Sequence, residues 1–264
     1  MGIVNVTPDS FSDGGQFFEP SAALTHARRL IAEGADILDL GGESTRPGAA
    51  PVSEVEELRR IIPLIQAIRL DSAVPLSIDT VKPAVARAAM LAGADMWNDI
   101  TALSHAPDSA DVAAALGCQV VLMHMQGEPR TMQADPHYED VVSEVADYLM
   151  TRAEAAIAAG VDRASILIDP GIGFGKTLAH NLALLAHLDR FVGLGFPVLL
   201  GLSRKRFIHA LDETAAQADD RLGGSLAGAL AGAEAGCAIL RVHDVRETAQ
   251  ALAVQAAIRA ARRA

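Results

Sequence analysis

The sequence has few features of secreted or nucleic-acid-binding proteins. Its 264 residues include only two cysteines, and 22 Lys and Arg stand against 33 Asp and Glu, a formal net charge of −11. Nucleic-acid binders need clustered cations to neutralise phosphates, so this balance argues against such a partner. Cys118 and Cys237 cannot build a disulfide framework, and both lie beside buried-strand patterns where free thiols behave as small apolar side chains. We therefore expect no nucleic-acid partner and a reducing, cytoplasmic location.

Long apolar runs and several well-known catalytic signatures are also missing. No stretch approaches the length of a transmembrane helix, and the N-terminal segment reaches polar Asn5, Thr7 and Asp9 too early for a signal peptide. The chain has no His-Glu-x-x-His, no Gly-x-Ser-x-Gly elbow and no Gly-x-Gly-x-x-Gly between a strand and a helix. We expect no membrane partner, and no zincin, serine-hydrolase or dinucleotide-binding chemistry.

The chain does contain eight short apolar runs, each followed by an amphipathic, Ala-rich stretch. The runs cover residues 3–6, 37–40, 74–78, 96–100, 119–123, 166–168, 198–202 and 238–242. Continuous Val/Ile/Leu runs are typical of parallel strands that are buried on both faces. Half of the residues are hydrophobic, enough for one substantial core. The sequence therefore predicts an α/β protein, a (β/α)8 TIM barrel in a single domain over residues 1–264.

Helical patterns fill the gaps between these runs. They cover residues 21–33, 53–70, 83–91, 109–116, 138–159, 179–190, 222–235 and 245–259. Ser53 with Glu56 has the spacing of a capping box, and Asp108 and Asp244 are N-cap candidates. Five glycines, each between a helical pattern and a strand, are predicted to stop helices in the left-handed conformation: Gly34, Gly93, Gly117, Gly160 and Gly236.

Polar side chains gather at or just past the carboxyl ends of the predicted strands. They are Asn5, Thr45 with Arg46, Asp79, Asn98, His124, Asp169, Lys205, and Arg241 with His243. The strand-to-helix links are long at 7–20, 41–52, 126–137, 170–178 and 203–221. TIM-barrel enzymes carry their catalytic groups in such links, so both observations predict one active site at this mouth of the barrel.

Three of these groups of residues allow two interpretations each when they are taken alone. The link after Asn5 is either a turn-rich loop or a source of hard oxygen ligands, from Asn5 and Asp13, for Mg²⁺ that carries phosphate oxygens. Arg46 is either solvated or an anion clamp. Asp79 and Asn98 either cap backbone groups or face a ligand. His124, beside two methionines, is more typical of a hydrogen-bonded structural residue.

The glycine-rich segment 169–177 ends in Gly-Lys-Thr but is not a phosphate loop. Three residues separate Gly171 from Gly175, whereas that motif requires four. We expect its glycines to let the backbone approach a flat ligand, with Phe174 as a wall and Asp169 accepting two parallel N–H bonds. The basic segments 203–206 and 241–244 follow the last two strands, where barrels often hold an anionic group.

Taken together, these segments resemble the dihydropteroate synthase family. The matching stretches are 1–15, 39–48, 77–83, 98–100, 122–133, 169–176, 201–205 and 241–248, in family order over essentially the whole chain. The resemblance implies condensation of 6-hydroxymethyl-7,8-dihydropterin diphosphate with p-aminobenzoate in folate biosynthesis. The products are 7,8-dihydropteroate and diphosphate, which leaves before the arylamine attacks.

The resemblance also implies a role for individual residues. The implied pterin-binding residues are Asp79, Asn98, Met123, Asp169, Phe174, Gly201, Lys205 and Arg241. The diphosphate would be bound by Asn5, Arg46, Arg241 and His243, with the cofactor Mg²⁺ at Asn5. The p-aminobenzoate site would comprise Phe11, Thr45, Pro47, Ser203, Lys205 and Arg206. The implied catalytic residues are Asp79, Lys205, Asp13 and Arg241.

Further expectations follow from the family pattern. Relatives carry an N-terminal extension over the far end of the barrel, so either the true start lies upstream or this barrel floor is less protected. At Arg206 many relatives have Ser, and Arg206 could bind the benzoate carboxylate through its backbone N–H or its guanidinium. Sulfonamides, which mimic p-aminobenzoate, should bind. A homodimer through the later helices is expected, since residues 222–235 are rich in small side chains.

Two other functions compete with this interpretation. A pterin-dependent methyltransferase shares the barrel and the pterin-holding carboxylate, but it has no use for the diphosphate site of Asn5, Arg46, Arg241 and His243. A non-catalytic pterin-binding protein could retain Asp169 and Asn98 and yet lack ordered catalytic loops. Release of diphosphate on turnover separates the synthase from both.

Overall fold

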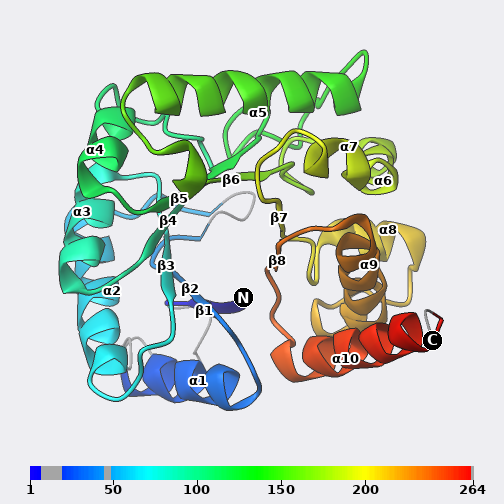
Figure 1. Cartoon of the computed structure of the whole chain (residues 1–264), viewed down its shortest axis with the longest axis horizontal. Helices are drawn as coiled ribbons and strands as arrows, with labels where there is room; N and C mark the ends of the chain where they lie inside the picture. The colour runs from blue at the N-terminus through cyan, green and yellow to red at the C-terminus, as the bar shows by residue number, and fades with distance from the viewer. Residues whose placement is uncertain (7–19, 45–48, 263–264) are drawn as a thin grey trace.

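The computed structural model describes residues 1–6, 20–44 and 49–262, and it alternates strands with helices (Figure 1). The strands are β1 (Gly2–Asn5), β2 (Leu38–Gly41), β3 (Leu76–Asp79), β4 (Met96–Asp99), β5 (Gln119–Met123), β6 (Ile166–Asp169), β7 (Leu199–Leu200) and β8 (Ile239–Leu240). The helices are α1 (Pro20–Ala32), α2 (Glu54–Arg69), α3 (Pro83–Ala92), α4 (Ser109–Leu116), α5 (Val141–Ala158), α6 (Leu178–Ala186), α7 (Leu188–Val192), α8 (Arg206–Leu211), α9 (Leu222–Ala235) and α10 (Val245–Ala261). Two 3-10 turns, Arg163–Ser165 and Asp219–Arg221, complete the described elements.

The strands form a closed parallel barrel. Strands β1 to β6 pair in sequence order, and β7 pairs with β8. The two sheets are joined by a parallel bridge between Ile168 and Val198 and by another between Gly2 and Val242. Across the second junction the Ile3 N–H donates to the Val242 carbonyl at 3.0 Å. The predicted (β/α)8 barrel is therefore confirmed, with the helices lying around the strands (Figure 1).

The barrel interior changes from apolar to polar along the strands. Four buried side chains form a cluster separate from the main core and mark the lower interior: Met96, Val121, Leu167 and Leu199. Positions two residues further along a strand point to the same side. Two positions beyond this cluster lie Asn98, Met123, Asp169 and Gly201. The register places Asn5, Gly41, Asp79 and Asn98 side by side on neighbouring strands. The interior is therefore polar at the carboxyl ends of the strands.

Most predicted helix ends are confirmed. All five predicted stop glycines have positive φ, between 62° at Gly117 and 112° at Gly93. The Ser53 hydroxyl accepts the Glu56 N–H at 3.3 Å. Asp108 and Asp244 occupy the predicted N-cap positions, although neither side chain accepts a helix N–H. Among the described residues, no helix is long and apolar enough to cross a membrane.

Two helix boundaries differ from the prediction for local reasons. Helix α5 begins at Val141 rather than at 138, because the Asp140 carboxylate caps the N–H groups of Val142 and Ser143. The stretch 179–190 is two helices, α6 and α7, which are separated at His187. Helix α8 was not predicted, since its six residues are too few to show a helical period.

Candidate active site

Arg241 lies at the centre of the polar interior, directly after β8. Its Nε donates to Oδ2 of Asp39 at 2.6 Å, and its Nη2 donates to Oδ2 of Asp79 at 2.8 Å. Asp39 is fully buried, and the Arg241 side chain is 19% exposed. Burial raises the pKa of Asp79, and the Arg241 charge opposes that shift. One guanidinium therefore holds two carboxylates from different strands in place.

Asp39 is a further residue of this polar cluster, and the motifs of the sequence did not single it out. Besides Arg241, it contacts the Asn98 amide nitrogen, which lies 3.4 Å from both of its carboxylate oxygens. A carboxylate only accepts hydrogen bonds, so this contact turns the Asn98 amide oxygen away from Asp39. The available signal was an acidic residue inside the apolar run 37–40, since a buried charge requires a partner.

Asp169 ends β6 and is 6% exposed. One carboxylate oxygen, Oδ1, accepts the Gly171 N–H at 2.7 Å, which fixes the orientation of the group. Burial raises the pKa of Asp169, while the charge of Lys205 is the main opposing influence. Asp169 therefore presents a positioned carboxylate edge at the barrel mouth.

Lys205 reaches the same region from the link after β7. Its ammonium group donates to the Ile172 carbonyl and lies 4.6 Å from the centre of the Phe174 ring. Burial lowers the pKa of Lys205 to about 8, and the nearby Asp169 carboxylate limits the decrease. The predicted Lys205, Asp169 and Phe174 are thus brought together.

Ser203 and His243 join the ends of β7 and β8. The Ser203 Oγ lies 3.2 Å from the His243 backbone nitrogen and 3.1 Å from His243 Nδ1. The neighbouring Arg204 has a φ of 60° and binds Asp244 through Nε at 3.0 Å and Nη2 at 2.5 Å. This fork turns the Arg204 side chain toward α10. Arg206, the first residue of α8, is exposed.

The two outer glycines of the 169–177 segment lie where the chain passes close to the link after β5. Gly171 and Gly175 have φ values of 68° and 61°, and a Cβ at either position would overlap the carbonyl oxygen of His124 or of Gln126. These glycines let the segment pack closely against the link after β5. Gly173 differs, because a Cβ there would lie 3.1 Å from the Lys205 side chain.

Asn5 is the one candidate metal ligand among the described residues. It is half-buried at the end of β1, and a Cβ placed on Gly41 would lie 3.5 Å from Asn5 Oδ1 and 3.9 Å from Asp79 Oδ2. In the described part of the chain, no three His, Cys, Asp or Glu side chains form a group that could hold a metal ion. One amide oxygen suits Mg²⁺ only if phosphate oxygens and water complete its coordination.

Five predicted site residues lie outside the described residues: Phe11, Asp13, Thr45, Arg46 and Pro47. Glu43 and Val52, which lie on either side of residues 45–48, are joined by a hydrogen bond. The Glu43 carboxylate accepts the Val52 N–H at 3.0 Å and pairs with Lys82 at 2.5 Å, and Lys82 also pairs with the fully buried Glu57 at 2.5 Å.

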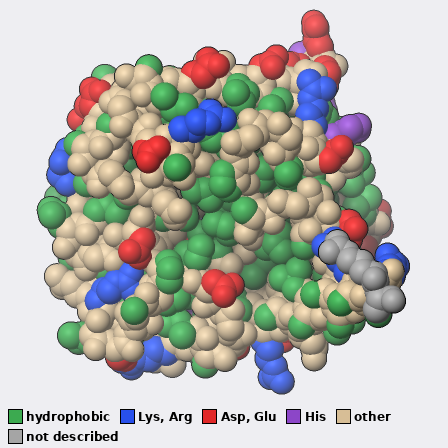
Figure 2. Space-filling view, viewed as in Figure 1, with side chains coloured by type: hydrophobic (Ala, Val, Ile, Leu, Met, Phe, Trp, Pro, Cys, Tyr) green, Lys and Arg blue, Asp and Glu red, His purple; other side chains and the backbone are tan. Residues whose placement is uncertain are grey.

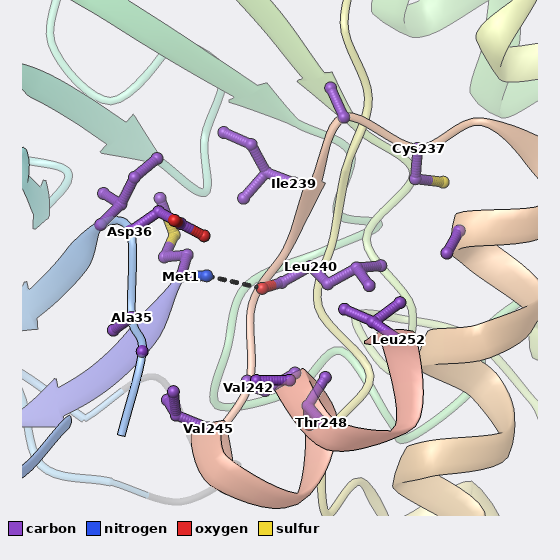
Figure 3. A pocket seen from close by; sticks show the side chains of 15 residues that line it. Met1, Ala35, Asp36, Cys237, Ile239, Leu240, Val242, Val245, Thr248 and Leu252 are labelled. Atoms are coloured by element: carbon purple, nitrogen blue, oxygen red, sulfur yellow. Dashed lines mark hydrogen bonds between the residues drawn. The ribbon is translucent and has the colours of Figure 1, made fainter. Parts of the chain in front are cut away.

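Two cavities lie at opposite ends of the barrel. One of about 510 Å³ opens beside Asp79, between the links that follow β2 to β5. The other, of about 300 Å³, lies at the barrel floor, where Met1 donates to the Leu240 carbonyl at 3.0 Å and Cys237 lines the wall (Figure 3). Figure 2 shows apolar side chains near the centre of one face of the molecule and charged ones scattered around them. Of these two cavities in the described part of the chain, the first adjoins the polar interior.

Comparison with known proteins gives a consistent result. The model of the pterin binding enzyme family matches residues 1–243. The chain is 47% identical to the dihydropteroate synthase of Haemophilus influenzae, over 96% of this chain and 91% of that protein. The dihydropteroate synthase of Xanthomonas albilineans, solved with 4-aminobenzoic acid, is 53% identical with a TM-score of 0.92, covering 98% of this chain and 92% of that one. The Yersinia pestis enzyme, solved with a sulfonamide drug, is 46% identical with a TM-score of 0.92, covering 98% and 93%.

Proposed function

The chain belongs to the pterin binding enzyme family, among its dihydropteroate synthases, and we propose that the buried polar cluster around Arg241 is its catalytic centre. It is a transferase of folate biosynthesis, which joins the dihydropterin diphosphate to p-aminobenzoate. The observation that supports this location is the meeting of Asp79, Asn98 and Asp169 from three strands at one end of the barrel.

The pterin is proposed to bind edge-on against Asp169 and Asn98. The Asp169 carboxylate would accept N–H bonds from the ring edge, and the Asn98 amide oxygen, turned away from Asp39, would accept another. Lys205 would donate to the ring carbonyl. Met123 and Gly201 occupy buried interior positions beside Asp169 and would leave room for the flat ring.

Arg241 is proposed to provide the stacking face and one part of the diphosphate site. A guanidinium held by Asp39 and Asp79 is planar and fixed, which favours stacking on a ring face. His243 and Asn5 lie at neighbouring strand ends and would bind diphosphate oxygens together with Arg46. Ser203, Lys205 and Arg206 would face the benzoate with Phe11, Thr45 and Pro47.

Mg²⁺ is proposed to bind together with the substrate, at Asn5. The single amide oxygen fits an ion whose remaining ligands are phosphate oxygens and water. When bound, the ion would neutralise diphosphate charge and so improve the leaving group. This chain's own contribution is to hold the diphosphate and the ring in fixed positions.

The proposed reaction begins with loss of diphosphate, which leaves a pterin-methyl cation for the arylamine to attack. The bond that breaks joins the methylene carbon to the diphosphate oxygen, and its electron pair leaves with the diphosphate. Asp79 and Asp13 would stabilise the positive charge on the pterin. The arylamine nitrogen then forms the new bond and releases a proton to water, so no strong general base is required.

The decisive experiment measures diphosphate release by the purified protein. With the dihydropterin diphosphate and Mg²⁺, release is expected to depend on p-aminobenzoate and to yield one dihydropteroate per diphosphate. Pterin binding without release would indicate a non-catalytic pterin-binding protein. Absence of pterin binding would contradict the proposed site. A sulfonamide, competing with p-aminobenzoate, should raise the apparent KM for that substrate.

The pH dependence of pterin use tests the role of Lys205. Burial lowers the pKa of Lys205 to about 8, so the free enzyme loses this cation as the pH rises through 8. Because only the protonated form donates to the pterin carbonyl, kcat/KM for the pterin diphosphate should fall above about pH 8. Lys205→Arg, whose guanidinium remains charged, should remove that decline even if its overall rate is lower. If kcat/KM of this variant still fell above about pH 8, Lys205 would not be the group responsible for the decline.

Two further properties are proposals of the same kind. A homodimer through the later helices is supported by Val254 and Ile258 on α10, which are 56% and 51% exposed. Light scattering of the purified protein should give twice the 27.6 kDa chain mass. A cytoplasmic location is supported by Cys118 and Cys237, both of which are free thiols.

A further inference from the structure

Lys176 is a buried lysine that the proposed mechanism does not use. It is 3% exposed, and no ion pair joins it to a carboxylate among the described residues. Its ammonium group lies 2.9 Å from His124 Nδ1 and donates to the carbonyl oxygens of Phe174, at 2.9 Å, and of His124, at 3.3 Å. A buried lysine with only neutral acceptors is costly to charge, and burial lowers the pKa of Lys176 to about 7.

The contact with Lys176 determines the state of His124. When Lys176 is protonated its ammonium group can only donate, so Nδ1 of His124 then accepts and the neutral imidazole carries its proton on Nε2. Burial and the Lys176 charge lower the pKa of His124 to about 3, which keeps the ring neutral. Tyr148 packs edge-on against the ring at 4.8 Å. In that state His124 is an oriented hydrogen-bond acceptor for Lys176.

The bonds to Lys176 are part of a continuous set along the link after β6. Every carbonyl oxygen from residue 172 to residue 176 accepts a side-chain hydrogen bond. The donors, in that order, are Lys205, Gln133, Lys176, Tyr138 and Asn181. Such a link has little freedom to move, and it carries the two groups that Lys205 contacts, the Ile172 carbonyl and the Phe174 ring.

We propose that Lys176 and His124 form a positioning pair for Lys205. The pair ties the Phe174 carbonyl to the link after β5, and so it holds the Ile172 carbonyl and the Phe174 ring where they can orient the Lys205 ammonium. Neither residue needs to touch the pterin. The inference rests on the proposed role of Lys205 in pterin binding.

A double-mutant cycle between His124 and Lys205 tests whether the pair acts through Lys205. His124→Leu removes the side-chain acceptor, and His124→Asn keeps one near the position of Nδ1. We expect His124→Leu to lower kcat/KM for the pterin diphosphate about tenfold, the equivalent of one net hydrogen bond, and His124→Asn to restore it to within about threefold. In a Lys205→Ala background, His124→Leu should lower kcat/KM by less than about twofold, because its effect passes through Lys205.

Arg152→Met is the matched control. Arg152 also donates to backbone carbonyls of a strand-to-helix link, those of Ala102 and Leu103, at 2.8 and 3.0 Å. Its replacement should give the same fold-change in kcat/KM with and without Lys205→Ala. The positioning pair would be overturned if His124→Leu lowered kcat/KM equally in both backgrounds, or if His124→Asn lowered it as much as His124→Leu. Either result would leave the proposed role of Lys205 in place. A fully active Lys205→Ala variant would instead overturn the proposed role of Lys205.

Discussion

Replacing Asp169 by asparagine is expected to lower kcat/KM for the pterin diphosphate by more than about 100-fold, the cost of losing two charge-assisted hydrogen bonds in a buried site. The Asp169 carboxylate is 6% exposed and already oriented by the Gly171 N–H. Asparagine would turn an NH₂ group toward one of the ring N–H donors. Neither of these two facing donors would then have an acceptor. The substitution also removes the negative charge that faces Lys205. Steady-state kinetics, with the pterin diphosphate varied at saturating p-aminobenzoate, measures this decrease in kcat/KM.

Asparagine is chosen because it preserves the local structure. Its amide oxygen can still accept the Gly171 N–H, so the melting temperature should change little and a loss of activity cannot be attributed to unfolding. Asp140→Asn, a substitution at the exposed N-cap of α5, is a matched carboxylate control and should keep normal pterin kinetics. Near-normal pterin KM in Asp169→Asn would show that the ring binds elsewhere.

The barrel could be predicted because its signal is local and repeated. Each strand is a short apolar run, and five of the described helices are followed within two residues by a glycine whose φ is positive. Strands β7 and β8 are shorter than the predicted runs, with two residues each. The polar strand ends were also predictable, because parallel strands in a closed barrel place their carboxyl ends at one mouth. Local patterns thus carried both the fold and the position of the site.

Long-range pairs could not be predicted in the same way. Asp39 and Arg241 are 202 residues apart, and Lys176 and His124 are 52 apart, so no sequence spacing relates them. A buried aspartate in a strand indicates that some cation must pair with it, but only the closure of β8 onto β1 shows which one. For the same reason the Gly-Lys-Thr ending of the link after β6 did not reveal that Lys176 binds His124.

Arg241→Met is expected to be the most damaging substitution for stability as well as for activity. It leaves Asp39 and Asp79 buried with no cation between them, and breaking a buried pair from one side typically costs about 3–5 kcal/mol of unfolding free energy. Burial already raises the pKa of Asp79 in the folded state and the Arg241 charge opposes that shift, so removing the cation raises the pKa of Asp79 further above its unfolded value. The folded variant then binds more protons than the unfolded chain, so its stability deficit should be smaller near pH 5 than near pH 8. Denaturant unfolding at the two pH values measures this difference.

Two companion variants separate the structural role of Arg241 from its role in the reaction. Arg241→Met combined with Asp39→Asn removes one unpaired charge and should recover about half of the lost unfolding free energy while remaining inactive. Arg241→Lys keeps a cation beside Asp39 and Asp79, so its unfolding free energy should fall less than that of Arg241→Met. An ammonium group cannot reproduce the planar face of the guanidinium, so kcat/KM should still fall more than about 100-fold. If Arg241→Lys keeps normal kinetics, charge alone suffices and Arg241 has no stacking role. If the double variant regains activity along with stability, Arg241 only holds the two carboxylates in place, and the pterin and diphosphate contacts proposed for it must be assigned to other residues.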